Sequence, residues 1–255
     1  MKSKISVIAI AALLLFSISI CASADCPRSW YIRRNGQNAP NFSKDSSIVD
    51  KYNGYYIDKS ASESQKKILY LTFDAGYENG NIERILDTLK KEAVPAAFFV
   101  LDNLILKNTD LVIRMTEEGH LVCNHTADHR DLTAGTREEI VKSVTNLEKL
   151  YDERIGGIMP KYFRFPEGKY DEESLRIICE LGYKSIFWSF AYDDWDNGRQ
   201  PSHERAMKKI LSNTHDGAVI LLHPTSKTNA DILPALISEW RKMGYSFGTL
   251  DDLTK

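Results

Sequence analysis

The sequence predicts an α/β protein in which mostly parallel strands are connected by helices. From residue 67 onward, short apolar runs alternate with amphipathic helical patterns, and this alternation is typical of parallel sheets with helical crossovers. Gly119, Gly182 and Gly244 each close a helical pattern directly before a strand-like run, where glycine supplies the left-handed residue that ends a helix. A barrel and an open doubly wound sheet share this pattern, so periodicity alone does not separate them.

The strands and helices are expected at regular intervals along the chain. Strand-like runs cover 68–73, 96–100, 121–123, 185–190 and 218–222. Helical patterns cover 80–92, 109–118, 136–151, 171–181, 203–212 and 229–243. In the first helix the apolar residues recur at i, i+3, i+4 and i+7 and therefore share one face, and they are Ile82, Ile85, Leu86 and Leu89.

The first 24 residues are expected to be a signal peptide. Lys2 and Lys4 precede an apolar run, and the segment ends in Ala22-Ser23-Ala24, a small-residue cleavage pattern. The alternative is a membrane anchor, but the run is marginal for a span of about 20 residues. We therefore expect an exported protein of the cell envelope or extracellular space, with no stable membrane span after cleavage.

Cleavage leaves an expected irregular N-terminal extension over 25–66 and a single domain over 67–255. The extension is rich in Tyr, Asn and Ser, and it either covers the bottom of the domain or borders a substrate groove. The segment removed carries two lysines and no acid, which leaves 31 basic against 35 acidic residues. This balance, without a Lys/Arg block, argues against a nucleic-acid partner.

Three cysteines remain after cleavage, namely Cys26, Cys123 and Cys179. An odd number without close spacing is not a disulfide framework. Cys123 and Cys179 have apolar neighbours and are expected to be buried thiols, although an oxidising compartment leaves one bridge open.

Polar residues cluster directly after the predicted strands, where α/β folds build their sites. Asp74 leaves an apolar strand and enters a glycine-bounded loop, and the competing role for it is turn formation. His223 ends the run 218–222, and histidine is well suited to proton transfer near neutral pH. His125 and His129 are four residues apart, so they can face one way on a helical turn and bind a metal.

Two further clusters are weaker taken singly. Arg164 lies beside a turn fixed by Pro166 and Gly168, and a surface salt bridge explains it equally well. The aromatic residues of 187–195 suit the stacking of sugar rings. Core packing is the preferred explanation for Trp188 and Phe190, while Trp195 has polar neighbours and is the better candidate for a sugar-binding surface.

Taken in order over residues 67–250, these five clusters resemble the polysaccharide deacetylase family, carbohydrate esterase family 4. The stretches TFDAGYENG and FWSFAYDDW look most like the branch that deacetylates muramic acid of spore-cortex peptidoglycan and so prepares muramic δ-lactam. The resemblance implies a distorted (β/α) barrel and an exported enzyme. In a spore-former the enzyme would act in the intermembrane space of the forespore.

The resemblance also implies a role for each cluster. Asp74 matches the general base, and Arg164 matches the arginine that pairs with that base and keeps it ionised. His125 and His129 match the ligands of a divalent metal that polarises the acetamide carbonyl and activates water. His223 matches the general acid that protonates the leaving amine.

Four further residues match positions that surround the substrate. Leu221 corresponds to the wall of the acetyl pocket. Asp194 and Trp195 fall in the motif that lines the groove and supports the acid histidine. The backbone N–H of Glu167 corresponds to an oxyanion donor, a role that is indifferent to the side chain.

The sequence departs from the family pattern at two positions. Ala75 stands where the family usually has an aspartate as third metal ligand, and a methyl group cannot ligate. A zinc, cobalt or manganese ion would then be held by two imidazoles plus water, or by Asp128 or Asp131, with lower affinity. Glu167 replaces an aromatic residue of the third motif.

The leading hypothesis is removal of N-acetyl groups from amino sugars of the peptidoglycan glycan strand, with N-acetylmuramic acid as the substrate. A related alternative is N-acetylglucosamine of peptidoglycan or of a chitin-like glycan. A non-catalytic glycan-binding protein on the same scaffold is a second alternative, motivated by Ala75. A third is a glycosidase that uses Asp74 and Glu78 as paired carboxylates.

Overall fold

The computed structural model describes residues 26–255. The expected signal peptide therefore lies outside the described residues. Within 26–255, no helix has both the length and the apolar character needed to cross a membrane.

An eight-stranded sheet forms the centre of the molecule, and its strands pair in parallel. Its order is β11-β5-β6-β7-β8-β10-β4, with β12 also paired to β5. The strands are β4 (Gly54–Tyr55), β5 (Ile68–Ala75), β6 (Ala97–Val100), β7 (Leu121–Asn124), β8 (Tyr162–Phe163), β10 (Lys184–Ile186), β11 (Ala218–Leu222) and β12 (Ser246–Gly248). Single bridges from Phe190 to Ile220 and from Ile57 to Ala218 connect the two ends of the sheet. The sheet thus curls into the distorted barrel that the resemblance implied.

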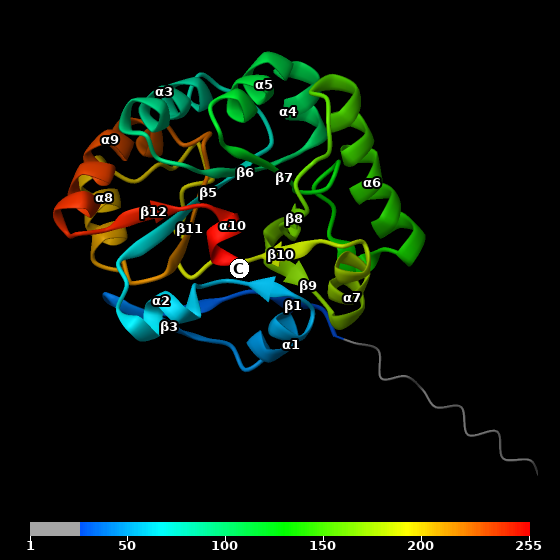
Figure 1. Ribbon diagram of the computed structural model, residues 1–255, viewed down its shortest axis with the longest axis horizontal. Coiled ribbons are helices and arrows are strands. Elements are labelled where there is room, and N and C mark those ends of the chain that lie inside the picture. The colour runs from blue at the N-terminus through cyan, green and yellow to red at the C-terminus, as the bar shows by residue number, and fades with distance from the viewer. Residues whose placement is uncertain (1–25) are drawn as a thin grey trace, which may run out of the picture.

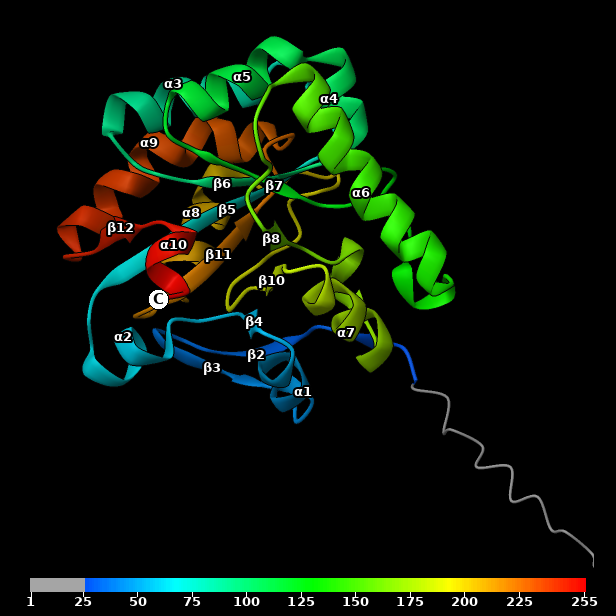
Figure 2. The same ribbon diagram turned by 45° about the vertical axis from the view of Figure 1, so that its right-hand side comes forward.

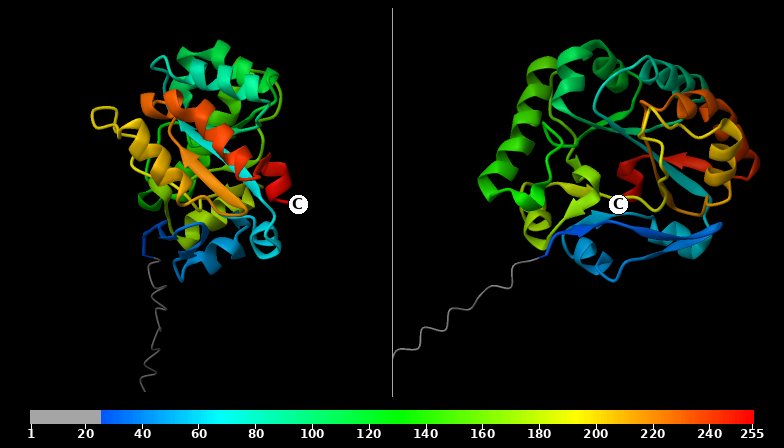
Figure 3. Two further views of the ribbon diagram at one scale, coloured as in Figure 1. Left: turned by 90° about the vertical axis from the view of Figure 1, so that its left-hand side faces the viewer. Right: turned by 180° about the vertical axis from the view of Figure 1, so that it is seen from behind.

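Helices surround the sheet and cover its outer face (Figure 1). They are α3 (Ile82–Glu92), α4 (Asp102–Lys107), α5 (Thr109–Glu117), α6 (Arg137–Arg154), α7 (Glu172–Glu180), α8 (His203–Leu211) and α9 (Lys227–Lys242). The short helix α10 (Leu250–Leu253) lies inside this ring, beside the C-terminus. Seen edge-on and from behind, the helices keep this arrangement around the strands (Figure 3).

The six predicted helices are confirmed to within a few residues. The strand expected over 185–190 ends its regular pairing at Ile186, and beyond it a single bridge pairs Phe190 with Ile220. The sequence analysis did not predict α4 or β8. Helix α4 has six residues and strand β8 has two, and both are too short to show a periodic pattern in the sequence.

Side chains of the strands pack into two layers. On the outer face, Leu69, Leu71 and Phe73 of β5 join the large core beneath the helices. On the inner face, Tyr70 and Phe99 belong to a smaller core inside the barrel. Because successive strand residues face opposite sides, Thr72 and Asp74 share the inner face with Tyr70. The inner face is therefore where polar groups of β5 collect.

The N-terminal extension differs from the irregular segment expected over 25–66. It contains β1 (Arg28–Ser29), β2 (Ile32–Asn35), β3 (Asn38–Phe42), α1 (Ser46–Lys51), β4 and α2 (Lys59–Ser64). Strand β4 joins the central sheet beside β10, and β1 pairs with β9 (Lys169–Tyr170). Strands this short are stabilised by pairing with strands that are distant along the chain, so the local sequence shows no strand pattern. Figures 1 and 2 show the extension lying along one flank of the barrel, below α7 and β10.

No disulfide joins the cysteines of residues 26–255. Cys123 is buried, as expected, inside the barrel. Cys179 is half-buried rather than buried, and Cys26 is exposed.

Replacing Phe98 by alanine should lower the free energy of unfolding by about 3–5 kcal/mol, the usual cost of truncating a buried phenylalanine. The ring is 0% exposed and stacks on Phe73 at 5.0 Å between ring centroids. Chemical denaturation measures the change. The matched control is Ile158→Ala, because Ile158 is 88% exposed, and it should change stability by less than about 0.5 kcal/mol. Equal losses in the two variants would contradict the assigned core.

Candidate active site

The register of the sheet brings four of the predicted site residues to one end of the barrel. Phe73 of β5 pairs with Leu222 of β11, so Asp74 and His223 follow side by side. Asn124 of β7 pairs with Phe163 of β8, so His125 and Arg164 also follow side by side. All four lie at the carboxyl ends of parallel strands, the end at which barrel sites form.

Arg164 is a fully buried cation whose donors are directed at the strand ends. Its side chain is 0% exposed, and its Nη1 donates to Asp74 Oδ1 at 2.8 Å. Nη2 donates to Thr72 Oγ1 at 2.9 Å, and Nε donates to the carbonyl oxygen of Ile186 at 2.9 Å. The guanidinium lies over the Phe99 ring at 4.1 Å. The ion pair of Arg164 is therefore buried and is not a surface salt bridge.

The surroundings of Asp74 keep its carboxyl group ionised. Burial alone raises its pKa, but the charge of Arg164, followed by those of His125 and His223, lowers the pKa below its ordinary value. A carboxylate in this state can accept a proton near neutral pH.

His125 is held as a neutral imidazole. Its Nδ1 lies 2.8 Å from the carbonyl oxygen of Arg164, which can only accept, so Nδ1 carries the proton and Nε2 keeps a free lone pair. That Nε2 lies 3.6 Å from Asp74 Oδ2. Burial is the main reason that the pKa of His125 falls to about 4.

The two histidines lie together, but not on a helical turn as expected. Their ring centroids are 4.9 Å apart in an edge-to-face arrangement. The segment between them is a loop in which Thr126 has φ 71° and His129 has φ 58°. Asn124 Oδ1 accepts from the Thr126 N–H at 2.9 Å and fixes the start of the loop.

This pair fits a divalent cation only as a two-imidazole site. Within residues 26–255, no group of three or more His, Cys, Asp or Glu side chains converges as a metal cage does. Asp128 is paired with Arg130, and Asp131 accepts from the Thr133 N–H at 3.0 Å. Ala75 is 0% exposed and packs into the outer core. Water would have to complete the coordination of any ion bound here.

His223 is oriented by a buried carboxylate. Its Nδ1 lies 2.7 Å from Asp194 Oδ1, and its backbone N–H donates to Asp194 Oδ2 at 2.8 Å. Asn229 Nδ2 also donates to Asp194 Oδ2 at 2.6 Å. Burial lowers the pKa of His223, but the charge of Asp194 and the hydrogen bond to it outweigh burial and raise the pKa above its ordinary value. The free Nε2 can therefore carry a proton near neutral pH.

The remaining predicted residues differ in their surroundings. Leu221 is the register partner of Thr72 and shares its inner face. Glu167 has φ 54° in the turn η2 (Pro166–Gly168), and its side chain forms an ion pair with Lys169 at 2.8 Å. Trp195 is 60% exposed, so its side chain is accessible from solvent. Trp188 is half-buried and Phe190 is buried, as expected for packing roles.

Sequence reasoning missed two residues that hold the site together. The hydroxyl of Thr72 accepts from Arg164 and donates to the Ile220 carbonyl at 2.8 Å, so it connects β5 to β11. Thr72 precedes Asp74 by two residues in β5 and therefore faces the same side of the sheet, and this spacing could have indicated it from the sequence. Asn229 is in the first turn of α9, and no local pattern indicated that it contacts Asp194.

Glu78 is already engaged as a helix cap. Its carboxylate accepts from the N–H of Ile82 at 2.9 Å and from the N–H of Gly80. Anionic caps of this kind stabilise the first turn of a helix. A glycosidase would need Glu78 as the second catalytic carboxylate beside Asp74, and the helix cap already occupies that carboxylate.

An ionised carboxylate and a protonatable imidazole at the carboxyl end of a parallel barrel are typical of hydrolases that work by acid–base catalysis. The family model described as polysaccharide deacetylase matches residues 61–186. Peptidoglycan-N-acetylmuramic acid deacetylase PdaA of Bacillus subtilis is 34% identical over 229 residues, which are 89% of this chain and 86% of the relative.

Two further comparisons agree with the family match. The solved structure of Bacillus subtilis PdaA, a family 4 carbohydrate esterase, matches with a TM-score of 0.84 at 34% identity, over 89% of this chain and 96% of that chain. Peptidoglycan-N-acetylglucosamine deacetylase PgdA of Listeria monocytogenes is 34% identical over 187 residues, 73% of this chain and 39% of the relative. This chain belongs to the polysaccharide deacetylase family, carbohydrate esterase family 4, and is a carbohydrate de-N-acetylase.

Replacing Asp194 by asparagine should lower the pKa of His223 below that of a free histidine, about 6.5. Asparagine removes the charge that raises the pKa, while burial, which lowers it, remains. NMR titration of the histidine ring protons measures the shift. His203 is the internal control, because it is 60% exposed and pairs with Asp231. An unchanged pKa of His223 would contradict the assigned contact.

Proposed function

We propose that this protein hydrolyses the N-acetyl group of N-acetylmuramic acid in peptidoglycan glycan strands. The product amine would prepare muramic δ-lactam in spore cortex, and the enzyme would act after export. The observation that carries the proposal is the pair formed by ionised Asp74 and His223, on neighbouring strand ends, with Arg164 behind the carboxylate. The likeness to PdaA over most of both chains supports the choice of sugar.

The chemistry follows from the protonation states of the two groups. Asp74 accepts a proton from water as the water oxygen bonds to the acetyl carbonyl carbon. The carbonyl oxygen becomes negative and is stabilised by the backbone N–H of Glu167. His223 then gives its proton to the sugar nitrogen as the C–N bond breaks, which leaves acetate and a free amine.

His125 and His129 are the residues that would hold a divalent cation. Such an ion supplies Lewis acidity at the acetyl carbonyl and lowers the pKa of bound water. His125 suits this role because it is neutral and its Nε2 is unprotonated. With Ala75 in the core and two protein ligands, we expect weaker affinity than in a three-ligand site.

Replacing Asp74 by asparagine should abolish acetate release, because the amide cannot accept the proton. The variant should still fold, with lower stability, because Arg164 loses its charged partner. Mass spectrometry of glycan fragments before and after treatment measures the loss of one acetyl group and locates it on muramic acid or glucosamine. Asp152→Asn is the control, since Asp152 is exposed on α6. Acetate release by Asp74→Asn at the rate of the unaltered protein would refute the mechanism.

Replacing His223 by alanine should lower kcat about 10²–10⁴-fold, the usual contribution of general acid–base catalysis. His203→Ala removes an exposed histidine on α8 and should keep full activity. Steady-state kinetics on soluble glycan fragments separate the two variants. A His223→Ala enzyme with unchanged kcat would rule out the general acid.

Calorimetric titration with zinc, cobalt or manganese should show one site per chain, and His125→Ala should remove it. The readout is binding heat, so it does not depend on turnover. His203→Ala removes an exposed histidine on α8, away from the strand ends, and should leave the titration unchanged. Undiminished binding by His125→Ala would place the ion elsewhere.

Ala75 also supports a second candidate, a non-catalytic glycan-binding protein. Its methyl group is buried in the core, so the third ligand that the family pattern supplies is missing. Glycan binding without acetate release in the presence of each of the three metals would favour this candidate over the enzyme.

A further inference from the structure

The N-terminal strap, defined as residues 28–42, is built into the turn that contains Glu167. Strand β1 pairs with β9, with Ser29 opposite Lys169. The next residue, Trp30, donates its backbone N–H to the carbonyl oxygen of Gly168 at 2.8 Å. The strap therefore makes main-chain hydrogen bonds with the segment that bears the expected oxyanion donor. The match to the family model begins only at residue 61.

The turn needs outside support because its backbone is left-handed at two successive residues. Glu167 has φ 54° and Gly168 has φ 65°, and a side chain larger than hydrogen rarely adopts this region. A Cβ on Gly168 would lie 2.7 Å from the Trp188 ring and 3.1 Å from the Cβ of Trp30. Trp30 and Trp188 therefore pack closely against the turn and restrict its conformation.

Trp30 connects this turn to the chain that follows β10. Its indole Nε1 donates to the carbonyl oxygen of Trp188 at 2.8 Å. The side chain is 5% exposed, and its ring centroid lies 4.8 Å from those of Tyr56 and Phe187. A single side chain therefore fixes the distance between the third-motif turn and the segment leading to Asp194.

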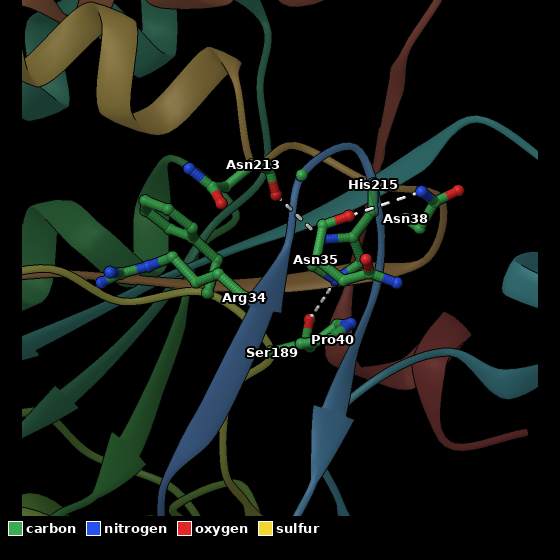
Figure 4. Close-up of a pocket in the computed structure, with 9 residues that line it drawn as sticks. Arg34, Asn35, Asn38, Pro40, Ser189, Asn213 and His215 are labelled. Carbon is green, nitrogen blue, oxygen red and sulfur yellow. Dashed lines mark hydrogen bonds between the residues drawn. The ribbon is translucent and has the colours of Figure 1, made fainter.

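The hairpin of β2 and β3 also contacts the segment that leads to Asp194, through Arg34. Arg34 Nη2 donates to the carbonyl oxygen of Ala191 at 2.6 Å, and its guanidinium lies 5.8 Å from the centre of the Phe190 ring. Figure 4 shows the hairpin lying across Ser189 and His215, which are hydrogen-bonded to each other at 2.8 Å. The bridge from Phe190 to Ile220, which helps to close the sheet, lies in this segment.

We propose that the N-terminal strap is a positioning element of the catalytic site, in which Trp30 holds the Glu167 N–H at the place where the oxyanion develops. The inference rests on the proposed hydrolysis of an acetamide. Trp30 touches no substrate. It acts through Gly168 and Trp188, and it stabilises the transition state because a preorganised donor costs no reorganisation during the reaction.

The test replaces Trp30 by phenylalanine, which keeps an aromatic ring but loses the indole N–H, and by leucine. We expect kcat to fall about 10–100-fold, since small misplacements of catalytic groups have effects of this size, while KM stays within about twofold because ground-state binding is unaffected. Affinity for the glycan with a methylphosphonamidate group in place of the acetamide, a mimic of the tetrahedral intermediate, should fall by the same factor as kcat/KM.

Gln37→Ala is the matched control. Gln37 is also in the strap, but its side chain contacts the Leu211 carbonyl at 3.3 Å, on α8. It should leave kcat, KM and binding of the mimic unchanged. Hydrogen exchange gives a readout that does not depend on turnover: the peptide 163–170 should exchange faster in Trp30→Phe and at the normal rate in Gln37→Ala.

The outcomes separate this inference from the proposed function. If the unaltered protein releases no acetate, the function fails, and the exchange experiment still decides whether Trp30 fixes the turn. If Trp30→Phe keeps full kcat, or lowers the affinity for the substrate and for the mimic by the same factor, the strap has only a structural role. Unchanged exchange of 163–170 would also overturn the inference.

Discussion

The site depends on one buried cation. Arg164 has no exposed surface, so its guanidinium is stable only where protein acceptors replace water. Those acceptors are Asp74 and Thr72 of β5 and the carbonyl oxygen of Ile186 in β10. One side chain thereby fixes strands from opposite parts of the sheet and sets the direction of the carboxylate.

The same cation sets one of the two protonation states that hydrolysis of an acetamide requires, and a second buried carboxylate sets the other. Arg164 lowers the pKa of Asp74, while Asp194 raises the pKa of His223 on the adjoining strand. Two groups at one end of a barrel are thus pushed apart in pKa, which is how a fold obtains a base and an acid at the same pH. In our proposal, the strap along the flank adds a third requirement, a rigid N–H at Glu167.

The sequence predicted what depends on local pattern. Alternating strands and helices predicted the fold class, and strand ends indicated Asp74, His125 and His223, because a polar residue after a buried strand stands out against its neighbours. Arg164 was assigned a role only by the family resemblance, because the two-residue strand before it leaves no pattern. It could not predict partners that are distant along the chain. Trp30, like Thr72 and Asn229, is defined by contacts with residues 35 to 158 positions away. The extension looked irregular because β1 and β4 pair with strands from the far half of the chain. The histidine pair was found, but its loop geometry was not, because positive φ values at Thr126 and His129 have no signal in residue type.

A double-mutant cycle on unfolding free energy tests the central claim most directly. Arg164→Met or Asp74→Asn alone leaves a buried polar partner unsatisfied, and breaking such a pair costs about 3–5 kcal/mol. Because each loss includes the same broken pair, the double variant should lose clearly less stability than the sum of the single losses. Losses that add to within about 0.5 kcal/mol would show that the two side chains do not interact, and the account of the site would then be wrong.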